Sequence, residues 1–194
     1  MKRSLFMGKK LVLVLVAILM MILSLTSCGQ KKQVTNTPEE IEQKIADALG
    51  SEKYLCTATV DKDEFFKFYE LDKSQVTSYV AKESSNPSDI PDRAVVLLVT
   101  EEYSKTAVDQ LNKAYAKIVE SVRKTSSDLG KTLNARIYEQ DGYVAFFLAG
   151  TKFENGSSEK EIRIAKKDYE TVDNTWKEIF GSIPSNLAIV PPAK

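Results

Sequence analysis

The chain has 194 residues with 27 basic and 27 acidic side chains and no histidine, so catalytic triads, cysteine–histidine pairs and metal sites that need an imidazole cannot form within it. The charge is unevenly distributed. Four basic residues and no acidic residue precede position 28, so residues 28–194 carry four more acidic than basic side chains. A mildly acidic domain lacks the clustered basic face that nucleic acid requires, and we expect no nucleic-acid partner.

The first 27 residues have the pattern of a secretory signal peptide. The basic residues lead into an uncharged, strongly apolar run over 11–25. This run has the length typical of a signal peptide and is shorter than the roughly 20 residues of a membrane span. An uncleaved signal anchor is the alternative interpretation.

The run ends in Leu25-Thr26-Ser27-Cys28, which resembles the lipobox of bacterial lipoproteins. The resemblance implies cleavage just before Cys28 and a covalent diacylglyceryl group on its sulfur. Because two acyl chains anchor a protein stably, we expect a cell-membrane protein that is lipid-anchored and faces the extracytoplasmic side. We expect no other cofactor. The predicted organisation is a signal peptide over 1–27, the lipidated cysteine and a spacer over 28–37, a folded domain over 38–182 and an irregular tail over 183–194.

The first half of the folded region predicts helices and strands in turn. Thr37 and Glu40 form a capping box, and apolar residues at helical spacing follow until Gly50. Residues 54–60 alternate in the manner of a short strand, less clearly than the others. The expected elements are a helix over 38–49, this uncertain strand, a helix over 62–71, a strand over 75–81, a loop over 83–91 and a buried strand over 94–99.

Cys56 lies in the uncertain strand, on a face with other apolar or small residues. If Cys28 is lipidated, Cys56 has no disulfide partner within the chain. We therefore expect a small buried apolar residue, which is how free cysteine usually behaves.

The second half begins with the longest clear helical pattern, over 104–124. A strand over 133–138, the turn Asp141-Gly142 and a strand over 143–149 then predict a hairpin. For 159–180, six apolar residues at helical spacing and a capping box at Ser158 favour one helix, and a strand over 161–165 is the alternative. The proline-containing tail is expected to be irregular.

This order of elements predicts a single α+β domain: an antiparallel sheet of about four strands, with helices packed on one face. The stretches TPEEIEQKIADAL, DEFFKFYELD, VTSYVA and LNARIYEQDGYVAFFLAG together resemble small lipoproteins of Gram-positive bacteria that share an uncharacterised domain. The resemblance covers roughly residues 38–180. It implies an extracytoplasmic lipoprotein with one compact α+β domain, and it implies no activity and no functional residue.

Several catalytic patterns fail at a required position. Gly130-Lys131-Thr132 looks like the end of a phosphate loop, but Thr125 stands where that motif needs glycine. Two serine–lysine matches, at Ser121 and Ser157, lack their partner motifs. Carboxylates are plentiful, but none is paired in an apolar sequence context. We therefore predict no catalytic residue and no metal ligand.

Two functional hypotheses remain. The first is a non-enzymatic module that binds an envelope protein, peptide or polymer through exposed aromatic side chains. The candidates for such a patch are Phe66, Tyr69, Tyr103 and Tyr138. The alternative is a small-ligand-binding lipoprotein that serves a transporter, although that class usually closes two lobes around its ligand.

Overall fold

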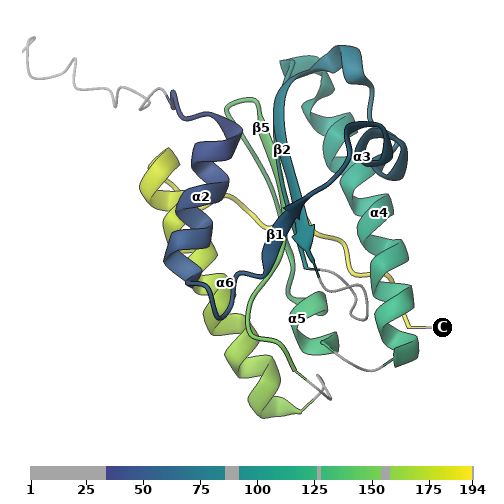
Figure 1. Cartoon of the computed structure of the whole chain (residues 1–194), viewed down its shortest axis with the longest axis vertical. Helices are drawn as coiled ribbons and strands as arrows, with labels where there is room; N and C mark the ends of the chain where they lie inside the picture. The colour runs from purple at the N-terminus through teal and green to yellow at the C-terminus, as the bar shows by residue number, and fades with distance from the viewer. Residues whose placement is uncertain (1–33, 86–91, 126–127, 154–157, 194) are drawn as a thin grey trace, which may run out of the picture. The chain divides into compact units, whose positions relative to one another are not determined.

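A five-stranded antiparallel sheet runs through the centre of the folded region (Figure 1). The computed structural model describes residues 34–85, 92–125, 128–153 and 158–193, so the predicted signal peptide and lipobox lie outside the described residues. The strands are Cys56–Thr59 (β1), Val76–Ser84 (β2), Arg93–Val99 (β3), Arg136–Gln140 (β4) and Tyr143–Leu148 (β5), in the order β1-β2-β3-β5-β4. The predicted α+β class is confirmed. The sheet has five strands rather than about four because the uncertain strand, β1, pairs at one edge with the end of β2.

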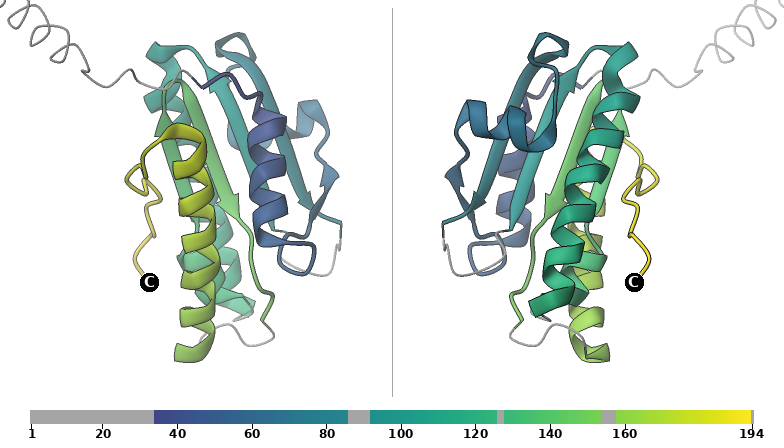
Figure 2. Two further views of the ribbon diagram at one scale, coloured as in Figure 1. Left: turned by 90° about the vertical axis from the view of Figure 1, so that its left-hand side faces the viewer. Right: turned by 90° about the vertical axis from the view of Figure 1, so that its right-hand side faces the viewer.

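Helices cover both faces of this sheet, and the prediction of helices on one face was wrong. The helices are Pro38–Leu49 (α2), Lys62–Tyr69 (α3), Ser104–Thr125 (α4), Leu129–Leu133 (α5) and Glu159–Phe180 (α6). Figures 1 and 2 show α2 and α6 against one face, and α3 and α4 against the other. All six side chains of β5 are buried, and a strand that is apolar on both sides needs cover on both sides.

The helix ends follow the sequence signals closely. The Thr37 side chain accepts a hydrogen bond from the Glu40 amide at 3.2 Å, and the Glu40 carboxylate accepts one from the Thr37 amide at 3.1 Å. Ser158 and Glu161 form the same reciprocal box at the start of α6. The region over 159–180 is thus one helix, as predicted, and the strand alternative was wrong.

The β4–β5 hairpin is also confirmed. Asp141 and Gly142 both have positive φ angles, 52° and 81°, the backbone that a two-residue type I′ turn requires. The preceding strand begins at Arg136 rather than at Leu133, because residues 129–133 form the short helix α5. At the other side of the sheet, β2 continues to Ser84, into the predicted loop. The rest of that loop, 86–91, lies outside the described residues.

Aromatic side chains fill both layers between sheet and helices. The Phe146 ring lies 5.8 Å from the Tyr115 ring of α4. The next residue, Phe147, lies on the opposite side, 6.5 Å from the Trp176 ring of α6. Trp176 in turn stacks on Phe180 at 4.3 Å. Consecutive strand residues point to opposite faces, so one strand anchors two cores.

The C-terminal tail is irregular, as predicted, but it is bonded to the sheet edge. The Leu187 amide donates to the Ile137 carbonyl at 2.8 Å, and the Asn186 side chain accepts from the Ile137 amide at 3.0 Å. The Asn112 side chain of α4 donates to the Leu187 carbonyl at 3.0 Å. The tail therefore occupies hydrogen-bonding groups along β4 that an edge strand otherwise leaves open.

A buried carboxylate fixes the connection between β5 and α6. The Asp168 side chain accepts from Lys53 Nζ at 2.7 Å and from the Thr151 amide at 2.9 Å. Gly150 packs against it: a Cβ at that position would lie 3.2 Å from Asp168 Oδ2. Burial alone raises the pKa of Asp168, but the hydrogen bonds from Lys53 and Thr151 outweigh it and lower the pKa below its ordinary value.

From Val34 onward the chain forms one compact unit. Within the described part of the chain, none of the helices combines the length and the apolar character that crossing a membrane would require.

Candidate functional site

The predicted aromatic patch does not exist as an exposed surface. Phe66, Tyr69 and Tyr138 are buried, and Tyr103 is half-buried with its hydroxyl accepting from the Asp72 amide at 2.7 Å. The Tyr138 hydroxyl donates to Asp173, and burial raises the pKa of Tyr69 to about 12. These four candidates were wrong as exposed binding residues. Phe66 and Tyr69 lie on the buried face of α3, and the Tyr138 ring packs 4.8 Å from the Trp176 ring of α6.

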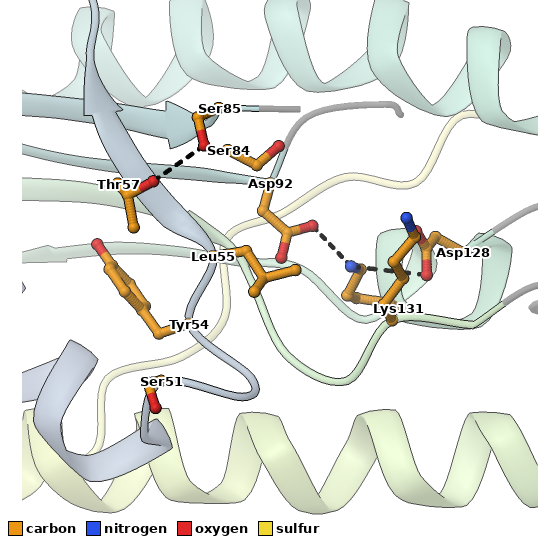
Figure 3. A pocket seen from close by; sticks show the side chains of 10 residues that line it. Ser51, Tyr54, Leu55, Thr57, Ser84, Ser85, Asp92, Asp128 and Lys131 are labelled. Carbon is orange, nitrogen blue, oxygen red and sulfur yellow. Dashed lines mark hydrogen bonds and ion pairs between the residues drawn. The ribbon is translucent and has the colours of Figure 1, made fainter. Parts of the chain in front are cut away.

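A recess lies at one end of the sheet, where five segments of the chain meet (Figure 3). It has a volume of about 330 Å³, within the lower range of small-ligand pockets. We call it the sheet-end cavity. Its lining residues are Ser51, Tyr54, Leu55, Thr57, Ser84, Ser85, Asp92, Asp128, Lys131 and Lys152.

The floor of the cavity is a buried charge cluster. Lys131 Nζ lies 2.6 Å from Asp92 Oδ1 and 3.6 Å from Asp128 Oδ1, and the Lys131 side chain is 2% exposed. Asp92 directly precedes β3, and the other two residues come from α5 and its N-cap position. Figure 3 shows the ammonium between the two carboxylates. The sheet thus brings together charges that are distant in the sequence.

Local backbone geometry places Asp128 and Lys131 on this floor. Asp128 has a left-handed backbone, with φ of 52°, just before α5, and its Oδ1 accepts from the Phe153 amide at 2.7 Å. One turn of α5 then separates Asp128 from Lys131 and lets both side chains reach the same place. The hydrogen bond between Phe153 and Asp128 also connects the start of α5 to the segment that follows β5.

Burying this cluster is costly in free energy. Desolvation of two charges in a protein interior often offsets or exceeds their mutual attraction, so apolar residues of the same size would frequently be as stable. The cluster therefore has no obvious advantage for stability alone. Buried, mutually paired charges at the bottom of an open recess are instead suited to contact a polar ligand.

Hydroxyl groups surround the mouth. Ser51, Thr57 and Ser85 are exposed, and Ser84 is half-buried. Thr57 Oγ1 and Ser85 Oγ form a hydrogen bond of 3.2 Å between β1 and the end of β2, in which either hydroxyl could donate. The mouth can therefore both donate and accept hydrogen bonds.

Two groups at or next to the cavity lining, Tyr54 and Cys56, stay protonated at neutral pH. Cys56 is buried, as predicted, and burial together with the charges of Asp92 and Glu42 raises the pKa of its thiol well above the ordinary value. Burial also raises the pKa of Tyr54, whose hydroxyl donates to Glu42. A thiolate is the reactive form of cysteine, so Cys56 is poorly placed as a nucleophile.

Glu42, which accepts the Tyr54 hydrogen bond, is also buried and pairs with Lys82 Nζ at 2.8 Å. Among the residues with described positions, no group of three or more cysteine, aspartate or glutamate side chains is arranged to hold a metal ion. The recess offers hydrogen bonds and paired charges.

Reasoning from sequence did not find this cavity. Lys131 lies in Gly130-Lys131-Thr132, which was considered only as the end of a phosphate loop. Asp92 directly follows the predicted loop over 83–91 and was not singled out. A weak signal was present: each of these charged residues is close in the sequence to buried residues. Their pairing depends on the β3–β5 register, which the sequence pattern alone does not specify.

Comparisons of this chain with protein-family models, with curated proteins and with solved structures find no match.

Proposed function

We propose that this chain is a lipid-anchored extracytoplasmic protein whose folded domain binds a component of the cell envelope without catalysing a reaction. Two observations support the proposal: the signal pattern that ends in Leu25–Cys28, and the sheet-end cavity in the domain that follows. The cavity carries the binding part, because its floor keeps Lys131 and Asp92 buried as an ion pair next to an open mouth.

The anchor is tested by labelling the full chain, in a bacterium that processes lipoproteins, with a fatty acid that carries an alkyne. Cys28→Ala should abolish labelling and move the protein out of the membrane fraction or leave it as an unprocessed precursor. Cys56→Ala is the matched control, because it removes the only other thiol and should label normally. Unchanged labelling of Cys28→Ala would overturn the anchor.

Binding through the cavity is tested by sedimenting the full chain, in detergent, with isolated envelope fragments. Ser85→Trp places a bulky ring at the exposed mouth and should reduce co-sedimentation. Ser121→Trp places the same ring on the exposed face of α4, away from the cavity lining, and should not. Equal retention of both variants would argue against the cavity. Turnover of an envelope ester, phosphoester or peptidoglycan fragment that one polar substitution abolishes would refute the non-enzymatic part.

A small-ligand-binding protein for a transporter is the second candidate. The cavity volume of about 330 Å³ favours it, because that space fits one small molecule. The single compact unit after Val34 favours the first proposal, because no second lobe is available within it to close over a ligand.

A further inference from the structure

The formal charges of the described residues that line the sheet-end cavity sum to zero. These residues include two carboxylates, Asp92 and Asp128, and two ammonium groups, Lys131 and Lys152. Two further ion pairs lie beside the cavity: Glu42 with Lys82 at 2.8 Å, and Arg93 with Glu83 at 3.1 Å.

Another recess shows that this balance is not general on the surface. It lies at the β4–β5 turn and is lined by Glu101, Glu139 and Asp141, with no basic residue among its lining residues. A cation suits that recess on charge alone. In the sheet-end cavity, by contrast, a ligand of either sign would bring an uncompensated charge onto a buried floor, which is strongly unfavourable.

The hydrogen-bonding groups further restrict the ligand. Carboxylates only accept, ammonium groups only donate, and hydroxyls do both. The floor therefore presents both donors and acceptors within a small space. The partner that matches such a mixture at zero net charge is a set of neighbouring hydroxyl groups, because each can donate to a carboxylate or accept from an ammonium.

Within the described residues, specific atoms can take part in this recognition. Lys131 has three N–H donors; one goes to Asp92 at 2.6 Å, and Asp128 at 3.6 Å is beyond hydrogen-bond distance. In the Thr57–Ser85 hydrogen bond, whichever hydroxyl accepts keeps its own hydrogen for a ligand.

We propose that the sheet-end cavity binds a neutral polyhydroxyl unit, a single saccharide ring of an envelope glycan or a free sugar. Its hydroxyls contact Lys131 on the floor and the Thr57–Ser85 pair at the mouth. The volume of about 330 Å³ fits one small unit rather than a long stretch of polymer. This inference rests on the proposed binding function and specifies its ligand.

The test is calorimetric titration of the full chain with three forms of one ring: N-acetylglucosamine, glucosamine at pH 6 and N-acetylglucosamine 6-phosphate. The detergent must lack a sugar head group, because such a head group would compete. We expect the neutral sugar to bind at least about tenfold more tightly than the cationic and anionic forms, which corresponds to 1.4 kcal/mol. Addition of N-acetylglucosamine oligomers distinguishes a glycan terminus from a free sugar.

Variants at the exposed mouth keep the test independent of folding. Ser85→Ala and Thr57→Val each remove one hydroxyl and should weaken neutral-sugar binding roughly two- to tenfold, the range of one hydrogen bond. Ser121→Ala, a hydroxyl deletion on α4, should leave the affinity unchanged. Tighter binding of a charged form, indifference of sugar binding to the mouth variants, or no binding of any of these sugars would overturn the inference.

The two proposals fail in different ways. If Ser85→Trp blocks envelope binding while no neutral sugar binds, the cavity is a binding site and the ligand class is wrong. If Ser85→Trp has no effect on envelope binding, the binding function itself is wrong.

Discussion

Replacing Lys131 by methionine should destabilise the domain far more than the loss of an ordinary surface ion pair. Methionine keeps much of the length of the side chain and removes its charge. The lysine is 2% exposed, and its removal leaves Asp92 and Asp128 buried without the ammonium between them. Breaking a buried pair from one side costs about 3–5 kcal/mol, a large share of the roughly 5–15 kcal/mol that stabilises a typical domain.

The measurement is urea unfolding of residues 34–194, followed by circular dichroism and analysed by linear extrapolation. Lys117→Met is the matched control: its ammonium pairs with Glu70 at 3.2 Å, but the Lys117 side chain is 59% exposed, so the loss of this pair should cost at most about 1 kcal/mol. Adding Asp92→Asn to Lys131→Met should recover part of the loss, because one buried charge disappears with its partner. A cost for Lys131→Met no greater than that of Lys117→Met would refute this account of the cavity floor.

Three further outcomes follow from the fold. The Asp168 pKa is lowered in the folded state, so its charge stabilises the domain above the unfolded value of about 3.9, and this contribution is lost as pH falls through the folded pKa. Unfolding experiments should therefore show Asp168→Asn clearly less stable than wild type at pH 7, with the gap closing below about pH 4; a gap that is constant with pH would contradict the assignment. Gly50→Ala, at φ 78° in open space, should cost about 1 kcal/mol, and Gly150→Ala should cost about twice that or more because its Cβ meets Asp168; equal thermal shifts would argue against this contact. Truncation after Ile183 should cost about 1 kcal/mol for each hydrogen bond lost from β4 and α4, and light scattering should detect self-association through the open edge; a stable monomer would show that the tail is dispensable.

The elements that the sequence predicted well depend on neighbouring residues. The capping boxes at Thr37 and Ser158 and the Asp141-Gly142 turn each involve groups only a few positions apart, so their geometry is encoded locally. The long apolar stripe of α6 outweighed a competing strand pattern for the same reason. Such signals need no knowledge of what packs against them.

The features that escaped prediction depend on distant parts of the chain. Helix α5 has five residues. Lys131 within it is buried, and its ion-pair partner, Asp92, is 39 positions away in the sequence. The alternation of Leu133, Ala135 and Ile137 therefore predicted a strand that begins three residues earlier than β4 does. Tyr138 was a candidate for an exposed patch, but it is buried because helices cover both faces of the sheet. The cavity also depends on distant residues: the hydrogen bond at its mouth joins Thr57 to Ser85, 28 positions away.

The strand order has a consequence for how the chain folds. β2 pairs with β3, and β4 pairs with β5, each over a short separation, whereas the β3–β5 pairing joins residues as distant as Arg93 and Leu148. Local contacts form faster than distant ones, so two halves, each with its own strand pair and helices, are expected to form before they dock. Asp92 belongs to the first half and Lys131 to the second, so the cavity floor comes into being only at docking. A ligand in the cavity contacts residues of both halves, so its binding stabilises the docked state relative to a state in which the halves are separated.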